Sequence, residues 1–398
     1  MKKRGMIYGH LLLILGLIGS NLIGLEAEEC TTGLARPEAT ANGRSLLWKN
    51  RDSSNRANAL HFFRSGSFSF LGLINANDTT QVWAGVNNYG FAIMNAEALD
   101  MAVPGEETGY DDEGFLMKMA LARCRSVQDF AEMLQNSNRS GRKVTSNFGV
   151  IDAQGNACYF EVGNHEFFRF DAAPTADGYA NRANFAFRAR GQEGYGKIRY
   201  QRANSLFRQA VAQRQLNAAF VITRVATDIE LPDSMIIKSD NPRRWRQTQE
   251  TINRYRTVAC AVFEGVLPQE DSRLTTFWIT LGEPALSLSI PLWVYANEVP
   301  VLFDSAGVSP LNEAFTKIRE YVYPDSAAPR LLDIQRLSHV QELLAPVQKQ
   351  IFKMTEQKLV IWRRRLPPAA QVSAFQQQMA LLAYNTACYI CKKILGVQ

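Results

Sequence analysis

One cysteine has an unusual position, and histidine, the usual base in nucleophilic catalysis, is scarce in this chain. Its 398 residues contain only four histidines, His10, His61, His165 and His339, and none belongs to a motif around a serine or cysteine nucleophile. Cys30, by contrast, directly follows a largely apolar N-terminal stretch. If that stretch is removed, Cys30 carries a free α-amine, whose reference pKa of about 7.7–8.0 suits a general base. We therefore expect Cys30 to be a nucleophile with its own amine as the base.

Two other roles are open for Cys30 at this stage. A lipid-anchoring cysteine normally follows a small residue such as Gly or Ala, whereas Glu29 precedes this one. Cys30 could also be a structural residue. The position of the cysteine directly after the apolar stretch favours the nucleophile.

The N-terminal stretch itself is typical of a secretory signal peptide. Basic residues at positions 2–4 precede an apolar run over residues 7–25, which glycine and polar residues interrupt too often for a membrane span of about 20 apolar residues. We expect residues 1–29 to be removed and the protein to be exported, to the periplasm or outside the cell, with no stable membrane span afterwards. Ala27 is the last small residue before the cysteine, so cleavage after it would leave Glu28 and Glu29 for a second step.

The charge and the remaining motifs exclude several classes of function. Lys and Arg exceed Asp and Glu by 44 to 38. The arginines around Trp245 and Trp362 are interpreted as solvated faces with an aromatic ring beneath, so no nucleic-acid partner is expected. The sequence has no glycine-rich nucleotide motif and no zinc-protease motif, and neither a cofactor nor a metal is expected.

The other cysteines are not expected to do chemistry. Cys124, Cys158 and Cys260 lie in apolar segments, where a free thiol behaves as a small buried hydrophobe. Cys388 and Cys391 form a C-x-x-C pair without the strand–helix–strand context of a redox site or a second zinc ligand pair. They are expected to be a local disulfide or two buried thiols.

The elements that would position Cys30 follow from periodicity and turn residues. A hairpin is predicted from Cys30 to Asp52, with Asn42-Gly43 as a type I′ turn. Further strands are predicted at 67–74, within 82–94, and at 147–151, 157–162, 166–170, 257–263, 275–281 and 286–295, and helices at 113–123, 127–134, 197–213 and 217–227. Runs of strands separated by runs of helices favour an α+β layered fold over a doubly wound one.

The chain changes character after about residue 305. Apolar residues recur at steps of three and four from Leu337 to Met354, which predicts an amphipathic helix with a kink at Pro346. A second apolar stripe begins after Pro367-Pro368. We therefore predict a catalytic domain over residues 30–305 and a helical extension over 306–398 that packs on it.

Several segments, in order, resemble N-terminal-cysteine amidases of the choloylglycine hydrolase and penicillin acyltransferase families. They are Cys30 to Thr32 with residues 39–44 and 47–52, Gly85 to Phe91, Asn147 to Asp152, Arg182 to Phe185, and the late strands between residues 257 and 291. Each segment alone is weakly specific, but their order is that of the family, and the exported acyltransferase-like branch is most similar. The resemblance implies a four-layer αββα sandwich of the N-terminal nucleophile (Ntn) hydrolase type, with a C-terminal α-helical extension.

The resemblance also implies a site made of Cys30, Asp52, Asn87, Asn184 and Arg254. Cys30 would supply nucleophile and base, Asp52 would hold the freed amine, and Arg254 would support the site. Asn184 would donate its side-chain N–H to the tetrahedral oxyanion, a contribution of about 2.7–4 kcal/mol to the barrier. Asn87 would assist, and Asn181 is the alternative to Asn184. Taken singly, these residues would be ordinary turn or cap formers.

Two positions depart from the family pattern. Lys49 stands where choloylglycine hydrolases carry arginine, which replaces a planar fork by a point charge and weakens a bile-salt activity. Ala183 stands where the family has threonine, next to the proposed oxyanion asparagine.

The sequence therefore predicts an exported, processing-activated amidase. It would cleave a linear amide of an N-acylated small molecule through an acyl-enzyme on Cys30, with hydrolysis or acyl transfer to follow. A bile-salt hydrolase, a dipeptidase on the related fold and a non-catalytic exported binding protein are the alternatives. A homo-oligomer is left open.

Overall fold

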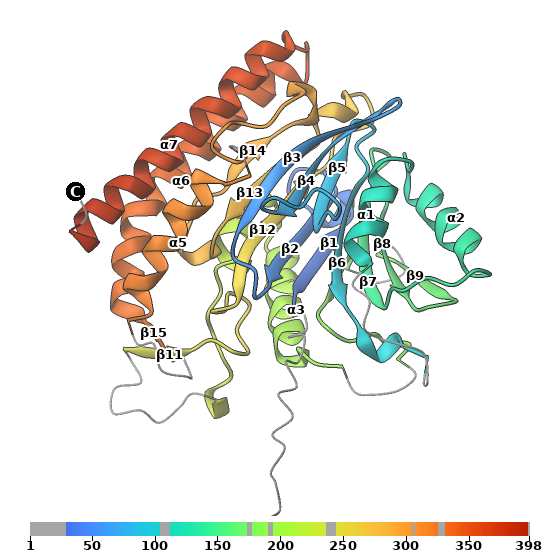
Figure 1. Cartoon of the computed structure of the whole chain (residues 1–398), viewed down its shortest axis with the longest axis horizontal. Coiled ribbons are helices and arrows are strands. Elements are labelled where there is room, and N and C mark those ends of the chain that lie inside the picture. Colours follow the sequence, from blue (N-terminus) through green and yellow to red (C-terminus); the bar gives the residue numbers. More distant parts are fainter. Residues whose placement is uncertain are drawn as a thin grey trace, which may run out of the picture.

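A computed structural model of the chain describes residues 29–103, 112–172, 177–189, 194–235, 244–304, 307–324 and 331–396. Residues 1–28, most of the predicted signal segment, lie outside these ranges. Within them, the core is built on two antiparallel sheets (Figure 1). Sheet A has the strand order β10 (Tyr179–Arg182), β1 (Thr31–Ala35), β2 (Leu46–Asp52), β12 (Thr257–Glu264), β13 (Thr276–Leu281), β14 (Ile290–Leu292). Sheet B runs β3 (Asn58–Ser65), β4 (Phe68–Asn75), β5 (Ala84–Asn87), β6 (Ala92–Glu97), β7 (Ser146–Ile151), β8 (Ala157–Val162), β9 (Phe167–Asp171).

The two sheets pack face to face. The Tyr159 hydroxyl of β8 donates a hydrogen bond to Thr32 Oγ1 of β1 at 2.9 Å. Lys49 Nζ of β2 donates to Asn95 Oδ1 of β6 at 2.5 Å. Every residue of β2 and of β12 is buried, as expected for strands whose sheet is covered on both faces.

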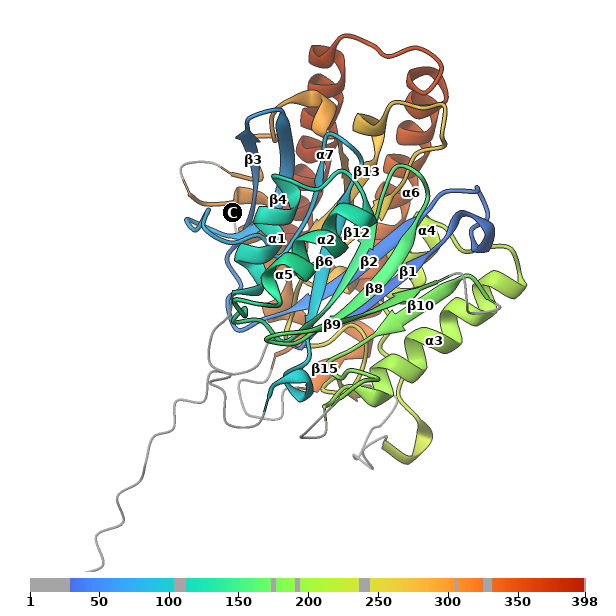
Figure 2. The same cartoon turned by 90° about the vertical axis from the view of Figure 1, so that its right-hand side faces the viewer.

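Helices cover the outer face of each sheet. On sheet B lie α1 (Glu113–Leu121) and α2 (Val127–Ser137), and Phe130 of α2 packs edge-on against Phe148 and Phe160. On sheet A lies α3 (Lys197–Ala212), whose Phe207 stacks on Trp48. Figure 2 shows α3 along β10 and β1. The order helix, sheet, sheet, helix confirms the predicted αββα sandwich.

The C-terminal helices pack on the β14 side of sheet A. They are α5 (Pro310–Val322), α6 (Ile334–Trp362) and α7 (Ala369–Leu395), and a short ladder of β11 (Trp245–Gln247) with β15 (Leu331–Asp333) precedes α6. Trp293, directly after β14, packs against Trp362 of α6 and Phe375 of α7. All three belong to the same hydrophobic core as the sheets. None of the helices within the described ranges has the length and apolar character needed to span a bilayer.

Three local predictions were wrong in detail. Asn42-Gly43 does not form a type I′ turn, because only Gly43 has a positive φ (+69°) and ten residues, including a 3-10 turn at Pro37–Ala39, separate β1 from β2. The helix predicted over 217–227 is a short α4 (Ala218–Phe220) followed by a π-helical turn at Val221–Val225, a β-branched run that disfavours α-helix. In the segment 286–295, only Ile290–Leu292 is a strand. The helix predicted around Pro346 is present as α6, which continues through this proline, and the kink there stays a prediction.

Candidate active site

Three neighbouring strands of sheet A bring the predicted site together. Cys30 directly precedes β1, and its neighbour Thr31 pairs with Asn50 of β2. On the other side of β2, Asp52 pairs with Thr257, the first residue of β12. Cys30 is 1% exposed and Asp52 is fully buried. The order β1, β2, β12 therefore places Cys30 and the Asp52 carboxylate at one end of the same sheet.

Asp52 has two polar partners that fix its carboxylate. Thr257 Oγ1 donates to Asp52 Oδ1 at 2.6 Å, and Arg254 Nη1 lies 3.3 Å from Asp52 Oδ2. Burial raises the pKa of Asp52 to about 6, although the charges of Arg254 and Arg199 oppose this rise. Burial alone would lower the pKa of Arg254, but the Asp52 and Glu29 carboxylates together raise it above its usual value.

A second arginine, Arg199 of α3, holds the backbone at Cys30. Its Nη1 donates to the Cys30 carbonyl and to Thr31 Oγ1, both at 2.9 Å. Gly196 at the start of α3 has φ +82°, and a Cβ there would lie 2.5 Å from Arg199 Nη2. The glycine thus gives both the left-handed conformation and the space that the guanidinium needs.

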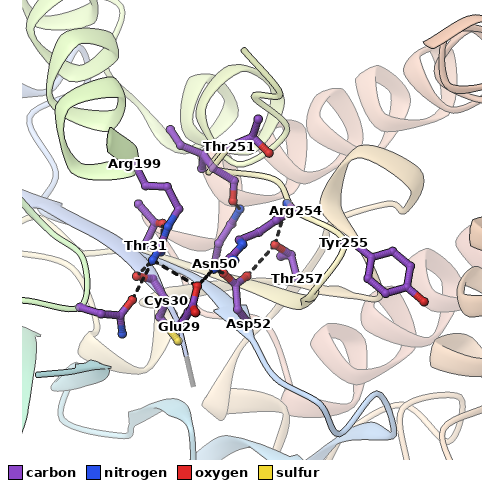
Figure 3. A network of polar contacts seen from close by, with 12 residues as sticks. Glu29, Cys30, Thr31, Asn50, Asp52, Arg199, Thr251, Arg254, Tyr255 and Thr257 are labelled. Atoms are coloured by element: carbon purple, nitrogen blue, oxygen red, sulfur yellow. Dashed lines mark hydrogen bonds and ion pairs between the residues drawn. The ribbon is translucent and has the colours of Figure 1, made fainter. Parts of the chain in front are cut away.

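Glu29, the residue before Cys30, lies between these two arginines. Its carboxylate forms an ion pair with Arg254 Nη1 and lies 3.7 Å from Arg199 Nη2. Figure 3 shows both arginine side chains directed at Glu29, Arg199 from α3 and Arg254 from the segment before β12. Four charged groups, Glu29, Asp52, Arg199 and Arg254, are therefore grouped beside Cys30.

The opposite face of sheet A carries a separate polar group. Side chains alternate along β1, so Cys30 shares a face with Thr32, which bonds to sheet B, rather than with Thr31, which bonds to Arg199. On the same face of β2, the fully buried Lys49 donates from Nζ to Asn95 Oδ1 and to the Trp83 carbonyl.

The structure separates the two candidates for the oxyanion donor. Asn184 Oδ1 accepts from Arg199 Nη2 at 3.1 Å, which connects Asn184 to the Cys30 backbone through one guanidinium, while its Nδ2 donates to the Glu97 carbonyl. Asn181 lies on the α3 face of β10, where its Oδ1 is close to Gly33 and its Nδ2 lies 3.5 Å from Asn204. The contacts favour Asn184 over Asn181, and the donor role itself stays a prediction.

Asn87 is not brought to the site. Its Nδ2 donates to the carbonyls of Leu121 and Cys124 at the end of α1, and its Oδ1 accepts from the backbone of Tyr89 and Phe91. The side chain therefore ties a turn to the outer helix layer, on the face of sheet B turned away from Cys30. These contacts do not support an oxyanion role for the Asn87 side chain.

Other reactive side chains lie apart from Cys30. His61 bonds to Asp304, and His165 bonds to the Asn138 carbonyl. All six cysteines are free thiols, so Cys388 and Cys391 form no disulfide. Across the ranges that the structure describes, no group of His, Cys, Asp and Glu side chains could hold a metal ion. A cavity of about 530 Å³ lies between α3, the π-helical turn and α6, and none of the predicted site residues lines it.

The family described as acyl-coenzyme A:6-aminopenicillanic acid acyl-transferase matches residues 39–267, which is more than half of the chain. The chain belongs to this family. The predicted resemblance is thereby confirmed. A comparison with curated proteins gave no match.

Solved structures similar to this acyl-transferase family member share little sequence with it. A variant of the conjugated bile acid hydrolase from Clostridium perfringens is 12% identical over 67% of this chain and 92% of its own, with a TM-score of 0.42. The N-acylethanolamine-hydrolyzing acid amidase ortholog from Caenorhabditis elegans is 13% identical over 63% and 99%, with a TM-score of 0.41. Penicillin V acylase from Agrobacterium tumefaciens is 11% identical over 66% and 86%, with a TM-score of 0.41.

In this acyl-transferase family member, three residues that contact the site, and Asn95, which bonds to Lys49 on the opposite face of sheet A, were not predicted from the sequence. Arg199 lies in a helix start rich in charge, where nothing marks one arginine as buried. Thr257 and Asn95 have strand positions, and only the pairing of strands and sheets shows their partners. Glu29 was assigned to the removed segment. A buried pair such as Thr257 with Asp52 could have been suspected only if the β2–β12 register had been known.

Proposed function

We propose that the chain is an exported amidase whose nucleophile is Cys30 once Cys30 is the first residue. Its substrate class is a linear amide of an N-acylated small molecule. The observation that carries this proposal is the position of Cys30 at the start of β1, with the Asp52–Arg254 pair and Arg199 in contact around it. Membership of the acyl-transferase family supports chemistry on an acyl group.

The mechanism assigns each group one task. The α-amine of Cys30 takes the thiol proton as Sγ attacks the amide carbonyl, and Asp52 holds that amine in position. Arg254 and Thr257 fix Asp52, and Arg199 fixes the Cys30 carbonyl. Asn184 is proposed as the oxyanion donor. The amine then protonates the leaving nitrogen, and water or an acceptor amine releases the acyl group from sulfur.

The test is a substrate panel on the mature protein. It contains N-acyl amino acids, N-acylethanolamines, conjugated bile acids, acylated 6-aminopenicillanic acid and dipeptides, with Cys30→Ala as the control. Release of amine from at least one N-acyl amide, lost by a factor of about 10³ or more in Cys30→Ala, is the expected result. Cleavage of dipeptides alone would favour the dipeptidase. Binding without turnover or Cys30 labelling would favour the non-catalytic binding protein.

A further inference from the structure

The Glu29 carboxylate occupies a site made by two buried arginines. The side chains of Arg199 and Arg254 are 1% and 5% exposed, and that of Glu29 is 26% exposed. Arg254 also pairs with Asp52, so two cations and two carboxylates are in contact. Arginines this buried need anionic partners, and the Glu29 carboxylate is one of them.

Arg199 holds the Glu29–Cys30 peptide bond from both sides. One amino group of its guanidinium donates to the carbonyl of Cys30, on the C-terminal side of the bond, at 2.9 Å. The other lies 3.7 Å from the carboxylate of Glu29, on the N-terminal side. Because the guanidinium is planar and rigid, the two contacts restrict how the peptide bond can turn relative to the Cys30 thiol. Such restriction is what an intramolecular attack requires.

We propose that Arg199 and Arg254 form a carboxylate-binding site for Glu29, which makes Glu29 a positioning residue in its own removal. This inference rests on the proposed processing of the chain at Cys30. Glu29 is the acid directly before Cys30, and Glu28, one position further away in the sequence, serves as the comparison in the test. Once the segment has left, the site loses one negative charge and Cys30 gains an amine.

The cleavage step is a transfer followed by hydrolysis. Cys30 Sγ attacks the Glu29 carbonyl carbon, so a carbon–sulfur bond forms and the Glu29–Cys30 carbon–nitrogen bond breaks. The thiol proton moves to the Cys30 nitrogen, which becomes the α-amine. Water then attacks the thioester carbonyl. This releases a segment whose C-terminal residue is Glu29, with a free α-carboxylate, and restores the Cys30 thiol.

The experiment follows self-cleavage of the full chain in a cell-free system without membranes or signal peptidase. Wild type, Glu29→Gln and the matched control Glu28→Gln are synthesised together, with Cys30→Ala as the uncleaved reference. Mass spectrometry measures the rate at which chains beginning at Cys30 appear. Glu29→Gln is expected to slow this rate at least about tenfold, since it removes a charge-assisted contact, and Glu28→Gln less than about twofold. Glu29→Asp, which keeps the charge on a shorter side chain, should recover part of the rate.

Three results would overturn the inference. They are a wild-type rate in Glu29→Gln, equal slowing in both glutamine variants, and no release of Cys30 from the wild-type chain. Thermal unfolding of each variant identifies any that fails to fold. If Glu29→Gln fails to fold, the cleavage rate of Glu29→Asp is compared with that of wild type in its place. The readout is independent of amidase activity. A chain that releases Cys30 normally but cleaves no N-acyl amide contradicts the proposed function and leaves this inference standing.

Discussion

Four consecutive side chains of β2, Lys49, Asn50, Arg51 and Asp52, are buried although each is polar or charged. They alternate between the two faces of sheet A. Arg51 lies over the Trp83 ring on the side of sheet B, and Asn50 donates to the Ala226 carbonyl on the helix side. Buried polar groups destabilise a fold unless they are paired. Four of the seven residues of β2 are therefore buried polar groups. Lys49 and Arg51 lie on the face that Cys30 shares, and Asp52 lies on the other.

The raised pKa of Asp52 predicts a pH-dependent stability of the unprocessed chain. The folded pKa, about 6, lies above the ordinary value of 3.8. The protonated carboxyl is thus favoured by folding, and its contribution is present below pH 3.8 and lost as the pH rises through 6. In the uncleaved Cys30→Ala chain, urea unfolding should show a loss of about 3 kcal/mol over this window relative to the Cys30→Ala/Asp52→Asn chain. A difference that does not change with pH between 4 and 6 would show that the pKa is not raised.

At the same scale, motif order singled out Cys30, Asp52 and Arg254, which the structure brings together, and their roles stay predictions. It also singled out Asn87, whose side chain instead satisfies backbone groups of a turn. It missed Arg199 because burial of a single arginine depends on how α3 packs against β1. Contacts between residues about 170 positions apart depend on tertiary packing, which local sequence patterns do not encode.

At the scale of elements, strands were predicted best where one pattern of apolar and polar residues extends along the whole strand. β7, β8, β12 and β13 were all predicted to within two residues. β3 was not predicted, although Gly66 with φ +58° forms the turn between β3 and β4. The centre of β3, a histidine followed by two phenylalanines, breaks the alternation expected of a strand on the edge of sheet B. The β1–β2 connection was mispredicted because an Asn-Gly pair can also close a longer loop.

On the scale of the whole molecule, the C-terminal helices share the core of the sandwich. Gln376 Oε1 of α7 accepts from the Trp293 backbone at 2.7 Å, and Gln348 of α6 bonds to both backbone groups of Ser289. The division at residue 305 thus stays a prediction about chain organisation, and the packing on either side of it is continuous. The extension is expected to stabilise sheet A from the β14 edge.

Trp362 tests that expectation. It is 4% exposed and packs edge-on against Trp293 and Phe375. Trp362→Ala should lower the free energy of unfolding by about 3–5 kcal/mol, because it leaves a cavity between α6, α7 and sheet A. The matched control is Ile361→Ala at the neighbouring, 63% exposed position, which should change it by no more than about 0.5 kcal/mol. Equal effects of the two variants in urea unfolding would mean that the extension does not stabilise the sandwich.

The central claim is that Cys30 acts with its own amine, and the N-terminus of the active protein tests it most directly. The protein is purified after export, its amidase activity is measured, and the intact mass and N-terminal peptide of the active fraction are determined. The account predicts that active chains begin at Cys30 and that an acylated intermediate, trapped at low pH, carries its added mass on that residue. A stable, active chain that begins upstream of Cys30 would contradict it.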